Sequence, residues 1–234
     1  MRICVFSDIH GNLAAFRVSY DMILSEKADI NIFLGDLCGY YFDQKEIFLM
    51  LQTIPNLIAL KGNHDDFFLC IVINKDKELR QTYLKKYGIS MENLLGQDIS
   101  ELSQWLSDLP ELYIHTDSGL AFYHGSPWDY LNGYVYPDSP LEKFLDYPDS
   151  LFVLGHTHYP MVRTIDSKVI VNPGSLGQPR NGGLPTYGII DCPSKNVIFR
   201  EISYDKTDLI RQIEKLDGKN EYLKRVLFRE RRYG

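Results

Sequence analysis

The chain of 234 residues is 44% apolar and 13% aromatic, which is typical of a globular protein that can bury a substantial core. A formal net charge of −6 argues against a general nucleic-acid-binding protein. The four cysteines show no CxxC spacing, so the sequence suggests neither a zinc knuckle nor a disulfide framework. Asp8 interrupts the first apolar run too early for a signal peptide, and no apolar stretch is long enough for a membrane helix. We expect a single cytoplasmic domain over residues 1–234, with no membrane segment.

The first 66 residues repeat a pattern of buried strand, polar turn and helix. Strands are predicted at Ile3 to Phe6, Ile30 to Leu34 and Leu57 to Leu60, and each ends in a polar cluster. This alternation predicts an α/β protein with a parallel sheet, in which ligands bind beyond the carboxyl ends of the strands.

Two polar residues are predicted to begin the helices of this region. Asn12 can cap a helix whose apolar side chains recur at helical spacing from Leu13 to Leu24. Asp43, followed three residues later by Glu46, resembles a capping box for a helix from Gln44 to Ile54.

The pattern changes between residues 67 and 110, where helical segments follow one another. Helices are predicted from Glu78 to Tyr87 and from Ile99 to Leu109, with Gly88 and Gly96 as breakers. We interpret residues 67–110 as a helical insertion or cap.

Strand signals return in the second half of the chain, which ends in a helical tail. The predicted strands are Leu112 to His115, Leu120 to Tyr123, Leu151 to Leu154, Met161 to Ile165, Val169 to Val171, Tyr187 to Asp191 and Val197 to Ile202. The tail, residues 206–234, is predicted to form two helices separated at Gly218.

Five short polar clusters contain five of the six histidines of the chain. They are Asp8-Ile9-His10, Gly35-Asp36, Gly62-Asn63-His64-Asp65, His124-Gly125 and Gly155-His156-Thr157-His158. Carboxylates, an asparagine and histidines at strand ends suit two divalent cations such as Mn, Fe, Zn or Ni, of which we favour Mn. Asp36 is the candidate bridge between the two ions, because it stands alone in its cluster. Two such ions polarise a phosphoryl group and lower the pKa of a shared water.

The motifs DxH, GD, GNHD, HG and GHTH, in that order, resemble those of the calcineurin-like metallophosphoesterase superfamily over the chain up to about Ser203. The resemblance implies a four-layer αββα sandwich of two mixed sheets flanked by helices, here with a helical insertion and a C-terminal helix pair. It also implies a ligand set, in which one metal is held by Asp8, His10 and His158, the other by Asn63, His124 and His156, and both by Asp36. His64 would donate a proton to the leaving oxygen.

Two further segments, GDLCGYYFD and NPGSLGQPRNGG, resemble a prokaryotic branch often described as phosphodiesterase-like or diadenosine-tetraphosphatase-like. Protein phosphatases of the superfamily carry Asp and Arg soon after the bridging aspartate, whereas the stretch Leu37 to Tyr40 has neither. An arginine there would bind a phosphomonoester dianion bidentately, so its absence favours diesters or nucleotide anhydrides. It also leaves His64 without the orienting carboxylate of those phosphatases, so Asp65 or Asp66 would have to serve. Arg180, in a glycine-rich loop, is a candidate phosphate contact.

We therefore predict a dinuclear metal-dependent hydrolase of phosphoester bonds, in which a metal-activated hydroxide attacks phosphorus in line. The expected substrate is a small-molecule phosphodiester or a nucleotide such as a dinucleoside polyphosphate. Two alternatives stay open. One is a serine/threonine protein phosphatase or other phosphomonoesterase, and the other is a non-catalytic scaffold with this fold.

Several side chains allow two interpretations. Trp128 and the tyrosines between residues 130 and 136 could stack on a nucleotide base or pack a loop. Cys38 could be redox-sensitive, but a small buried residue is the favoured interpretation. His115 matches no motif and is interpreted as a packed or surface histidine.

The basic residues of the tail also allow two interpretations. They are Lys224, Arg225, Arg229, Arg231 and Arg232. Because acidic residues are interspersed among them, we favour a solvated helix face or a homo-oligomer contact over a nucleic-acid site.

Overall fold

The computed structural model describes residues 1–192 and 194–229, which form two five-stranded sheets, eight α-helices and two short 3-10 helices. The first sheet has the order β10-β9-β1-β2-β3. Strands β1, β2 and β3 are parallel, whereas β9 lies antiparallel to both β1 and β10. The bounds are β1 (Arg2–Phe6), β2 (Ile30–Phe33), β3 (Leu57–Ala59), β9 (Thr186–Asp191) and β10 (Asn196–Glu201).

The second sheet has the order β4-β5-β6-β8-β7. Strands β5, β6 and β8 are parallel, and β4 and β7 are antiparallel edge strands. The bounds are β4 (Leu112–His115), β5 (Leu120–Tyr123), β6 (Leu151–Leu154), β7 (Met161–Ile165) and β8 (Lys168–Asn172), with the 3-10 helix η1 (Thr116–Ser118) between β4 and β5. The predicted strands, including the β7–β8 hairpin, are confirmed, and both sheets are mixed.

Apolar side chains between the two sheets form the central core. Val5 of β1 and Ile32 of β2 belong to one buried cluster with Phe122 of β5 and Val153 of β6. Because successive side chains of a strand point to opposite faces, Phe6 of β1 lies in a different cluster on the outer face of the first sheet. The sandwich of two sheets that the resemblance implies is therefore confirmed.

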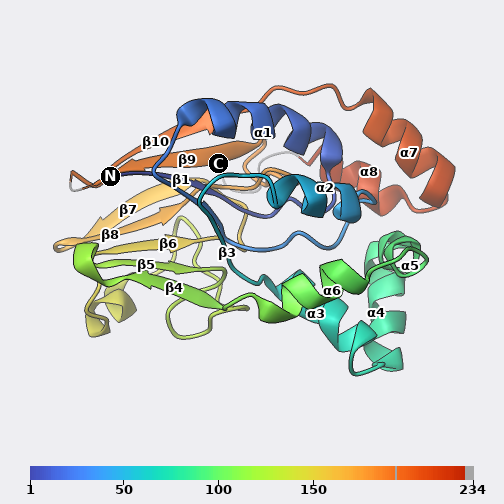
Figure 1. The fold of residues 1–234 in the computed structure, drawn as a ribbon, viewed down its shortest axis with the longest axis horizontal. Coiled ribbons are helices and arrows are strands. Elements are labelled where there is room, and N and C mark those ends of the chain that lie inside the picture. The colour runs from blue at the N-terminus through green and yellow to red at the C-terminus, as the bar shows by residue number, and fades with distance from the viewer. Residues whose placement is uncertain (193, 230–234) are drawn as a thin grey trace.

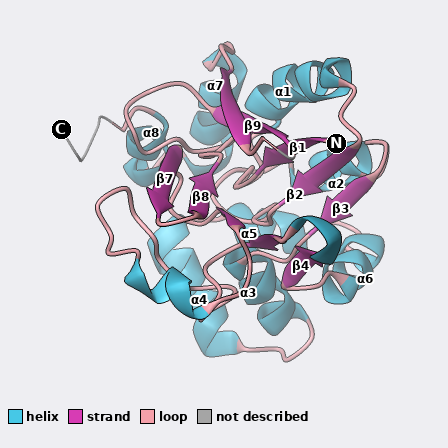
Figure 2. Cartoon of the chain, turned by 90° about the vertical axis from the view of Figure 1, so that its left-hand side faces the viewer, coloured by secondary structure: helices cyan, strands magenta, loops and turns pink. Residues whose placement is uncertain are grey.

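Helices α1 (Leu13–Glu26) and α2 (Gln44–Leu51) run along the outer face of the first sheet (Figure 1). Figure 2 shows α1 beyond β9, β1 and β2, on the side away from β4. Asn12 caps α1 as predicted, because its Oδ1 accepts a hydrogen bond from the backbone N–H of Ala15 at 3.1 Å.

The capping box predicted at Asp43 is wrong. The Asp43 carboxylate makes no hydrogen bond to the first turn of α2 and accepts one from Nε2 of Gln212 at 2.8 Å. Glu46 is paired with Arg17 of α1 at 2.5 Å. Tertiary partners that are distant in the sequence have replaced the local cap.

The outer face of the second sheet is covered mainly by a long loop, residues 124–147. This loop contains the 3-10 helix η2 (Glu142–Asp146), and Phe144 of η2 packs on Phe152 of β6 with ring centroids 5.0 Å apart. Val135 and Leu141 of the loop belong to the same buried cluster, which contains no residue of an α-helix among the described residues. The fourth layer is therefore thinner than the helical layer that the resemblance implies.

The predicted helical insertion is confirmed as a run of four helices, and the tail as two. They are α3 (Asn63–Val72), α4 (Lys77–Tyr87), α5 (Ser90–Leu95), α6 (Ser100–Asp108), α7 (Thr207–Asp217) and α8 (Glu221–Leu227). Figure 1 shows these helices gathered at one end of the two sheets, on the right. Among the described residues, no helix is long and apolar enough to cross a membrane.

Candidate active site

The predicted ligands lie where parallel strands end. Asp8 and His10 follow β1, and Asp36 follows β2. The two loops run side by side, because the N–H of Asp8 donates to the Gly35 carbonyl and the N–H of His10 to the Asp36 carbonyl, both at 3.0 Å. In the second sheet, His124 follows β5. This topology gathers residues from both sheets at one end of the sandwich.

Five of the predicted ligands have a left-handed backbone conformation, which is uncommon for residues other than glycine. The φ angles are 55° at Asp8, 51° at His10, 64° at Asp36, 65° at His156 and 64° at His158. Such conformations cost free energy and cluster at functional sites. The sharp turns aim these side chains back toward the strand ends.

The first group of donor atoms comes from Asp8, His10, Asp36 and His158, whose ligand atoms all lie within 4.8 Å of one another. Nε2 of His158 is 3.1 Å from Oδ1 of Asp8, and Nε2 of His10 is 3.6 Å from Oδ2 of Asp36. All four side chains are buried. They could hold one metal ion.

The second group shares Asp36 with the first and adds His124 and His156. Nε2 of His124 lies 3.4 Å from Oδ2 of Asp36 and 3.0 Å from Oδ1 of Asn63. Asn63 is therefore brought to this group, as predicted. The shared Asp36 carboxylate lies between the two groups, which is the placement that a bridging ligand needs.

The histidine rings are held with their Nε2 atoms facing the centre. Nδ1 of His10 donates to the Cys38 carbonyl at 2.8 Å, and Nδ1 of His158 donates to the Gln178 carbonyl at 2.7 Å. In the neutral rings, both Nε2 atoms then carry a lone pair, and the two atoms lie 3.2 Å apart. Buried acceptors at that distance need a positive charge between them.

Two further acceptor atoms of the candidate ligands are buried without a hydrogen-bond partner among the described residues. They are Oδ1 of Asp8 and Nε2 of His156. An unpartnered buried acceptor is costly, and a metal ion would satisfy both atoms. The donor set of carboxylate, amide oxygen and imidazole suits Mn, Fe or Zn. The residues present therefore fit a two-metal centre.

The pKa values of the histidine ligands indicate whether protons or a metal ion supply the positive charge in the site. Burial lowers the pKa of His156 to about 3 and that of His158 to about 4, so both rings are neutral near pH 7. Burial also lowers the pKa of His10. At His124, burial is outweighed by the Asp36 carboxylate, which raises the pKa to about 9. Neutral rings are good metal ligands, so a metal ion is a better source of positive charge here than protons on three of the rings.

The predicted proton donor, His64, lies in the first turn of α3 beside Asp36. Its backbone N–H donates to Oδ1 of Asp36 at 2.8 Å. Its Nδ1 is 2.9 Å from the hydroxyl of Tyr83, a buried residue of α4. Gly39 leaves room for this contact, because a Cβ at that position would lie 2.6 Å from Nδ1 of His64 and 2.7 Å from the Tyr83 hydroxyl.

The prediction that Asp65 or Asp66 orients His64 is wrong, and Tyr83 occupies that position. The Asp65 carboxylate accepts hydrogen bonds from the N–H groups of Asp36 (2.8 Å), Cys38 (2.9 Å) and Gly62 (3.0 Å). It therefore joins the loop after β2 to the loop after β3. Sequence reasoning missed Tyr83, although Tyr83 and Tyr87 form an aromatic i, i+4 pair in a helix whose other residues are mostly polar.

Four of the candidate ligands, Asp36, Asn63, His156 and His158, line a cavity of about 400 Å³. Arg180 lies in its wall, where its guanidinium is 3.4 Å from the Tyr40 hydroxyl and 3.4 Å from Oε1 of Gln178. Its Nε is buried without a hydrogen-bond partner among the described residues. Arg180 therefore keeps hydrogen-bonding capacity next to the ligands, which suits the predicted phosphate contact.

Of the two aromatic residues Trp128 and Tyr134 in the loop after β5, Tyr134 lines the cavity and Trp128 does not. The Tyr134 ring lies 4.1 Å from the His156 ring, stacks on Tyr136 and is 53% exposed. Trp128 packs on Phe144 with ring centroids 5.0 Å apart, within the loop that covers the second sheet. For Trp128 the packing interpretation is the one that the structure supports.

The structure also places Cys38, His115 and the basic residues of the tail. Cys38 is fully buried, as predicted, and burial raises the pKa of its thiol well above the usual value. His115 is half-buried in β4, away from the site. In the tail, Lys224 pairs with Glu214 at 3.0 Å. Arg229 lines the cavity, which corrects its assignment to a solvated helix face, and Arg231 and Arg232 lie outside the described residues.

Comparison with known proteins agrees with this geometry. The family model of the calcineurin-like phosphoesterase superfamily domain matches residues 1–195. An uncharacterized protein of Methanocaldococcus jannaschii is 29% identical over 228 residues, covering 87% of this chain and 88% of its own.

Two crystal structures share the fold over nearly the whole chain. A metallophosphoesterase from Sphaerobacter thermophilus is 26% identical with a TM-score of 0.79, covering 97% of this chain and 99% of its own. A hypothetical protein from Pyrococcus horikoshii OT3 is 22% identical with a TM-score of 0.75, covering 97% and 98%. The chain belongs to the calcineurin-like phosphoesterase superfamily.

Proposed function

We propose that this metallophosphoesterase cleaves phosphodiesters or nucleotide anhydrides with the help of two divalent metal ions. The observation that carries the proposal is the pair of buried donor groups that share Asp36, which lines the cavity. Asp8, His10 and His158 would hold one ion, and Asn63, His124 and His156 the other. A non-catalytic scaffold would have no use for so many buried acceptors without partners.

When bound, two such ions polarise the phosphoryl group and lower the pKa of a shared water. The protein residues have separate tasks. Asp36 fixes the spacing of the two groups and accepts the backbone N–H of His64 at 2.8 Å. His64 can then donate a proton to the leaving oxygen, and Arg180 can donate hydrogen bonds to a non-bridging phosphate oxygen.

The loop after Asp36 supports diesters and nucleotide anhydrides as the proposed substrate class. Its residues 37–40 are Leu-Cys-Gly-Tyr, so the loop offers no guanidinium for a terminal phosphate dianion. A diester or internal anhydride carries less charge at the reacting phosphorus and can be held by the two ions and Arg180. The exposed ring of Tyr134 offers a stacking surface for the rest of a nucleotide.

One observation favours a phosphomonoesterase as the second candidate. Arg180 lies in the cavity wall with buried, unpartnered hydrogen-bonding capacity, so it could bind a dianion by another route. The native metal, a homo-oligomer contact through the C-terminal helices and a cytoplasmic location stay predictions.

A substrate screen after loading with Mn²⁺ tests the proposal. It compares phosphomonoesters, cyclic nucleotides, linear diesters and dinucleoside polyphosphates. We expect kcat/KM for diesters or dinucleoside polyphosphates to exceed that for p-nitrophenyl phosphate and phosphoserine peptides. A clear preference for phosphopeptides would overturn the substrate class, and inactivity toward all four groups, with no Mn²⁺ bound, would overturn the function itself.

A further inference from the structure

The outer part of the cavity is built by elements outside the two sheets. Tyr87 of α4 and Tyr222 of α8 line it, and their rings lie 5.1 Å and 6.2 Å from the ring of Tyr40. Tyr222 lies beyond residue 195, where the match to the superfamily ends. The insertion and the tail therefore meet over the site, and they form a wall that the sheet scaffold does not provide.

The two elements are fixed to each other next to this wall. The carboxylate of Asp217, at the end of α7, accepts hydrogen bonds from the N–H of Ile89 at 3.1 Å and from Nδ2 of Asn220 at 3.2 Å. Gly88 allows this approach, because a Cβ there would lie 2.0 Å from Oδ2 of Asp217. The position of α8 relative to α4 is thus set by packing and by hydrogen bonds.

Two cations on this wall have no acidic partner. Lys86 lines the cavity from α4 with its Nζ 4.8 Å from the centroid of the Tyr87 ring, and Arg229 lines it from the end of α8. Among the described residues, neither forms an ion pair, whereas Arg80 of α4 and Lys224 of α8 are paired with glutamates. In a chain with net charge −6, unpaired cations facing a cavity indicate an anionic ligand.

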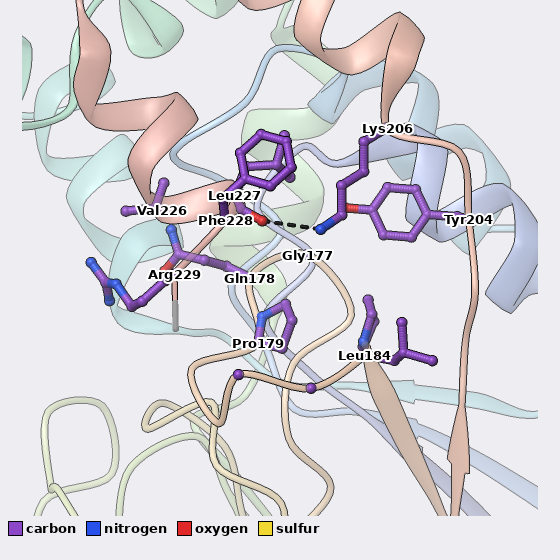
Figure 3. Close-up of a pocket in the computed structure, with 13 residues that line it drawn as sticks. Gly177, Gln178, Pro179, Leu184, Tyr204, Lys206, Val226, Leu227, Phe228 and Arg229 are labelled. Atoms are coloured by element: carbon purple, nitrogen blue, oxygen red, sulfur yellow. Dashed lines mark hydrogen bonds between the residues drawn. The ribbon is translucent and has the colours of Figure 1, made fainter. Parts of the chain in front are cut away.

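The backbone that carries Arg229 is anchored. Lys206 donates from its Nζ to the Leu227 carbonyl at 3.2 Å and lies over the Phe228 ring at 5.0 Å (Figure 3). The N–H of Arg229 donates to the Val226 carbonyl at 3.3 Å. Figure 3 also shows Arg229 at the edge of a second cavity, of about 210 Å³, between the loop of residues 177–185 and α8. Arg229 thus stands where the two cavities adjoin.

We propose that Lys86 and Arg229 form a second phosphate subsite, which binds a phosphoryl group of the substrate other than the one that is hydrolysed. This inference rests on the proposed function and narrows its substrate class to compounds with several linked phosphoryl groups, such as nucleoside polyphosphates. Arg180, beside the metal ligands, serves the reacting phosphorus. Two tyrosine rings connect Arg180 to Lys86, because the Tyr40 hydroxyl is 3.4 Å from the Arg180 guanidinium, the Tyr40 and Tyr87 rings are 5.1 Å apart, and the Lys86 Nζ lies over the Tyr87 ring. The next phosphates of such a chain would follow these rings from Arg180 to Lys86.

The test is a series of diadenosine compounds joined by one, three or four phosphates, with bis(p-nitrophenyl) phosphate as a reference diester at constant free Mn²⁺. All members carry two adenosines, so stacking is matched. For the wild-type protein we expect kcat/KM to rise with phosphate number. In Lys86→Gln and Arg229→Gln, the ratio of kcat/KM for four phosphates to that for one should fall about tenfold each, because each removes a charged hydrogen bond.

Control variants remove one positive charge each from α4 and α8, outside the cavity lining. Lys85→Gln and Arg225→Gln should keep the wild-type ratio, and thermal melting should show that all four variants are folded. A ratio that Lys86→Gln and Arg229→Gln leave unchanged would overturn the subsite, while hydrolysis of bis(p-nitrophenyl) phosphate would still support the proposed function. Loss of hydrolysis of every diester in the wild-type protein would overturn both.

Discussion

The hydroxyl of Tyr83 lies 2.9 Å from Nδ1 of His64, and both side chains are buried. Burial raises the pKa of Tyr83 well above its usual value, so the hydroxyl keeps its proton. Burial also holds the pKa of His64 well below its usual value, so the ring is neutral. A neutral ring that gave up its only N–H would become an imidazolate, so His64 acts as the proton donor in its protonated form, in which Nδ1–H donates to the Tyr83 hydroxyl and Nε2–H is free for the leaving oxygen.

Replacing Tyr83 with Phe should slow the hydrolysis of substrates with poor leaving groups, such as dinucleotides, by about tenfold or more. Esters of p-nitrophenol should be affected much less, because nitrophenolate leaves with little protonation. Steady-state kinetics on both kinds of substrate would measure the difference. Metal content should remain that of the wild-type protein.

Tyr41→Phe is a matched control, because the Tyr41 hydroxyl is also buried but has no hydrogen-bond partner among the described residues. It should leave the ratio of the two rates unchanged. If Tyr83→Phe slows both kinds of substrate equally, Tyr83 supports the structure of the site and does not position the proton donor.

Asp36→Asn should abolish the shared metal site. The amide keeps one oxygen that can accept the His64 N–H, so the fold should survive, but it removes the charge that would bridge the two ions. Substitutions of residues that only support ligands cost about 10–100-fold in affinity or activity, so loss of the bridge should exceed about 100-fold. Elemental analysis and hydrolysis of bis(p-nitrophenyl) phosphate with Mn²⁺ would measure it.

Asp43→Asn is the control for this substitution, because Asp43 bonds Gln212 away from the site. It should keep the wild-type metal content and rate. An Asp36→Asn protein that retained two metals and full activity would exclude Asp36 as the bridge.

Asp65→Ala should destabilise the fold more than Asp66→Ala does. Three buried N–H groups would lose their acceptor, and each unsatisfied buried donor costs at least about 1 kcal/mol, so we expect a loss of about 3 kcal/mol. Asp66→Ala should cost less than about 1 kcal/mol, because the carboxylate of Asp66 only approaches the Cys70 sulfur, at 4.0 Å. Urea unfolding of both variants would measure the difference, and equal losses would contradict the role given to Asp65.

The ligand positions could be predicted from the sequence because two rules coincide there. Residues such as Asp36 and His124 follow short apolar runs, and parallel strands deliver their carboxyl ends to one edge. The donor types then indicate a metal without any knowledge of the packing. The strands and most helices followed from hydrophobic periodicity for the same reason, namely that each signal is local.

The residues that sequence reasoning missed depend on packing between distant elements. Tyr83 reaches His64 only because α4 packs beside α3, and Arg229 reaches the cavity only because the tail returns to the insertion. No periodic signal encodes either contact. Asp65 illustrates the opposite error, in which sequence proximity was taken for contact. Its position next to His64 in the sequence suggested that it orients His64, but its carboxylate accepts hydrogen bonds from three backbone N–H groups.

Tyr134 and Trp128, two of the aromatic residues in the loop after β5, should have different roles. Tyr134→Ala should lower the ratio of kcat/KM for a dinucleoside polyphosphate to that for bis(p-nitrophenyl) phosphate, because it removes a stacking surface worth about 1–3 kcal/mol per base. Trp128→Ala should leave this ratio unchanged and destabilise the fold by about 3 kcal/mol, because its ring packs on Phe144 within the loop that covers the second sheet. Kinetics with both substrates and urea unfolding would separate the two effects. If Trp128→Ala lowers this kcat/KM ratio without loss of stability, Trp128 is the stacking residue. If Tyr134→Ala leaves the ratio unchanged, Tyr134 does not stack on the substrate.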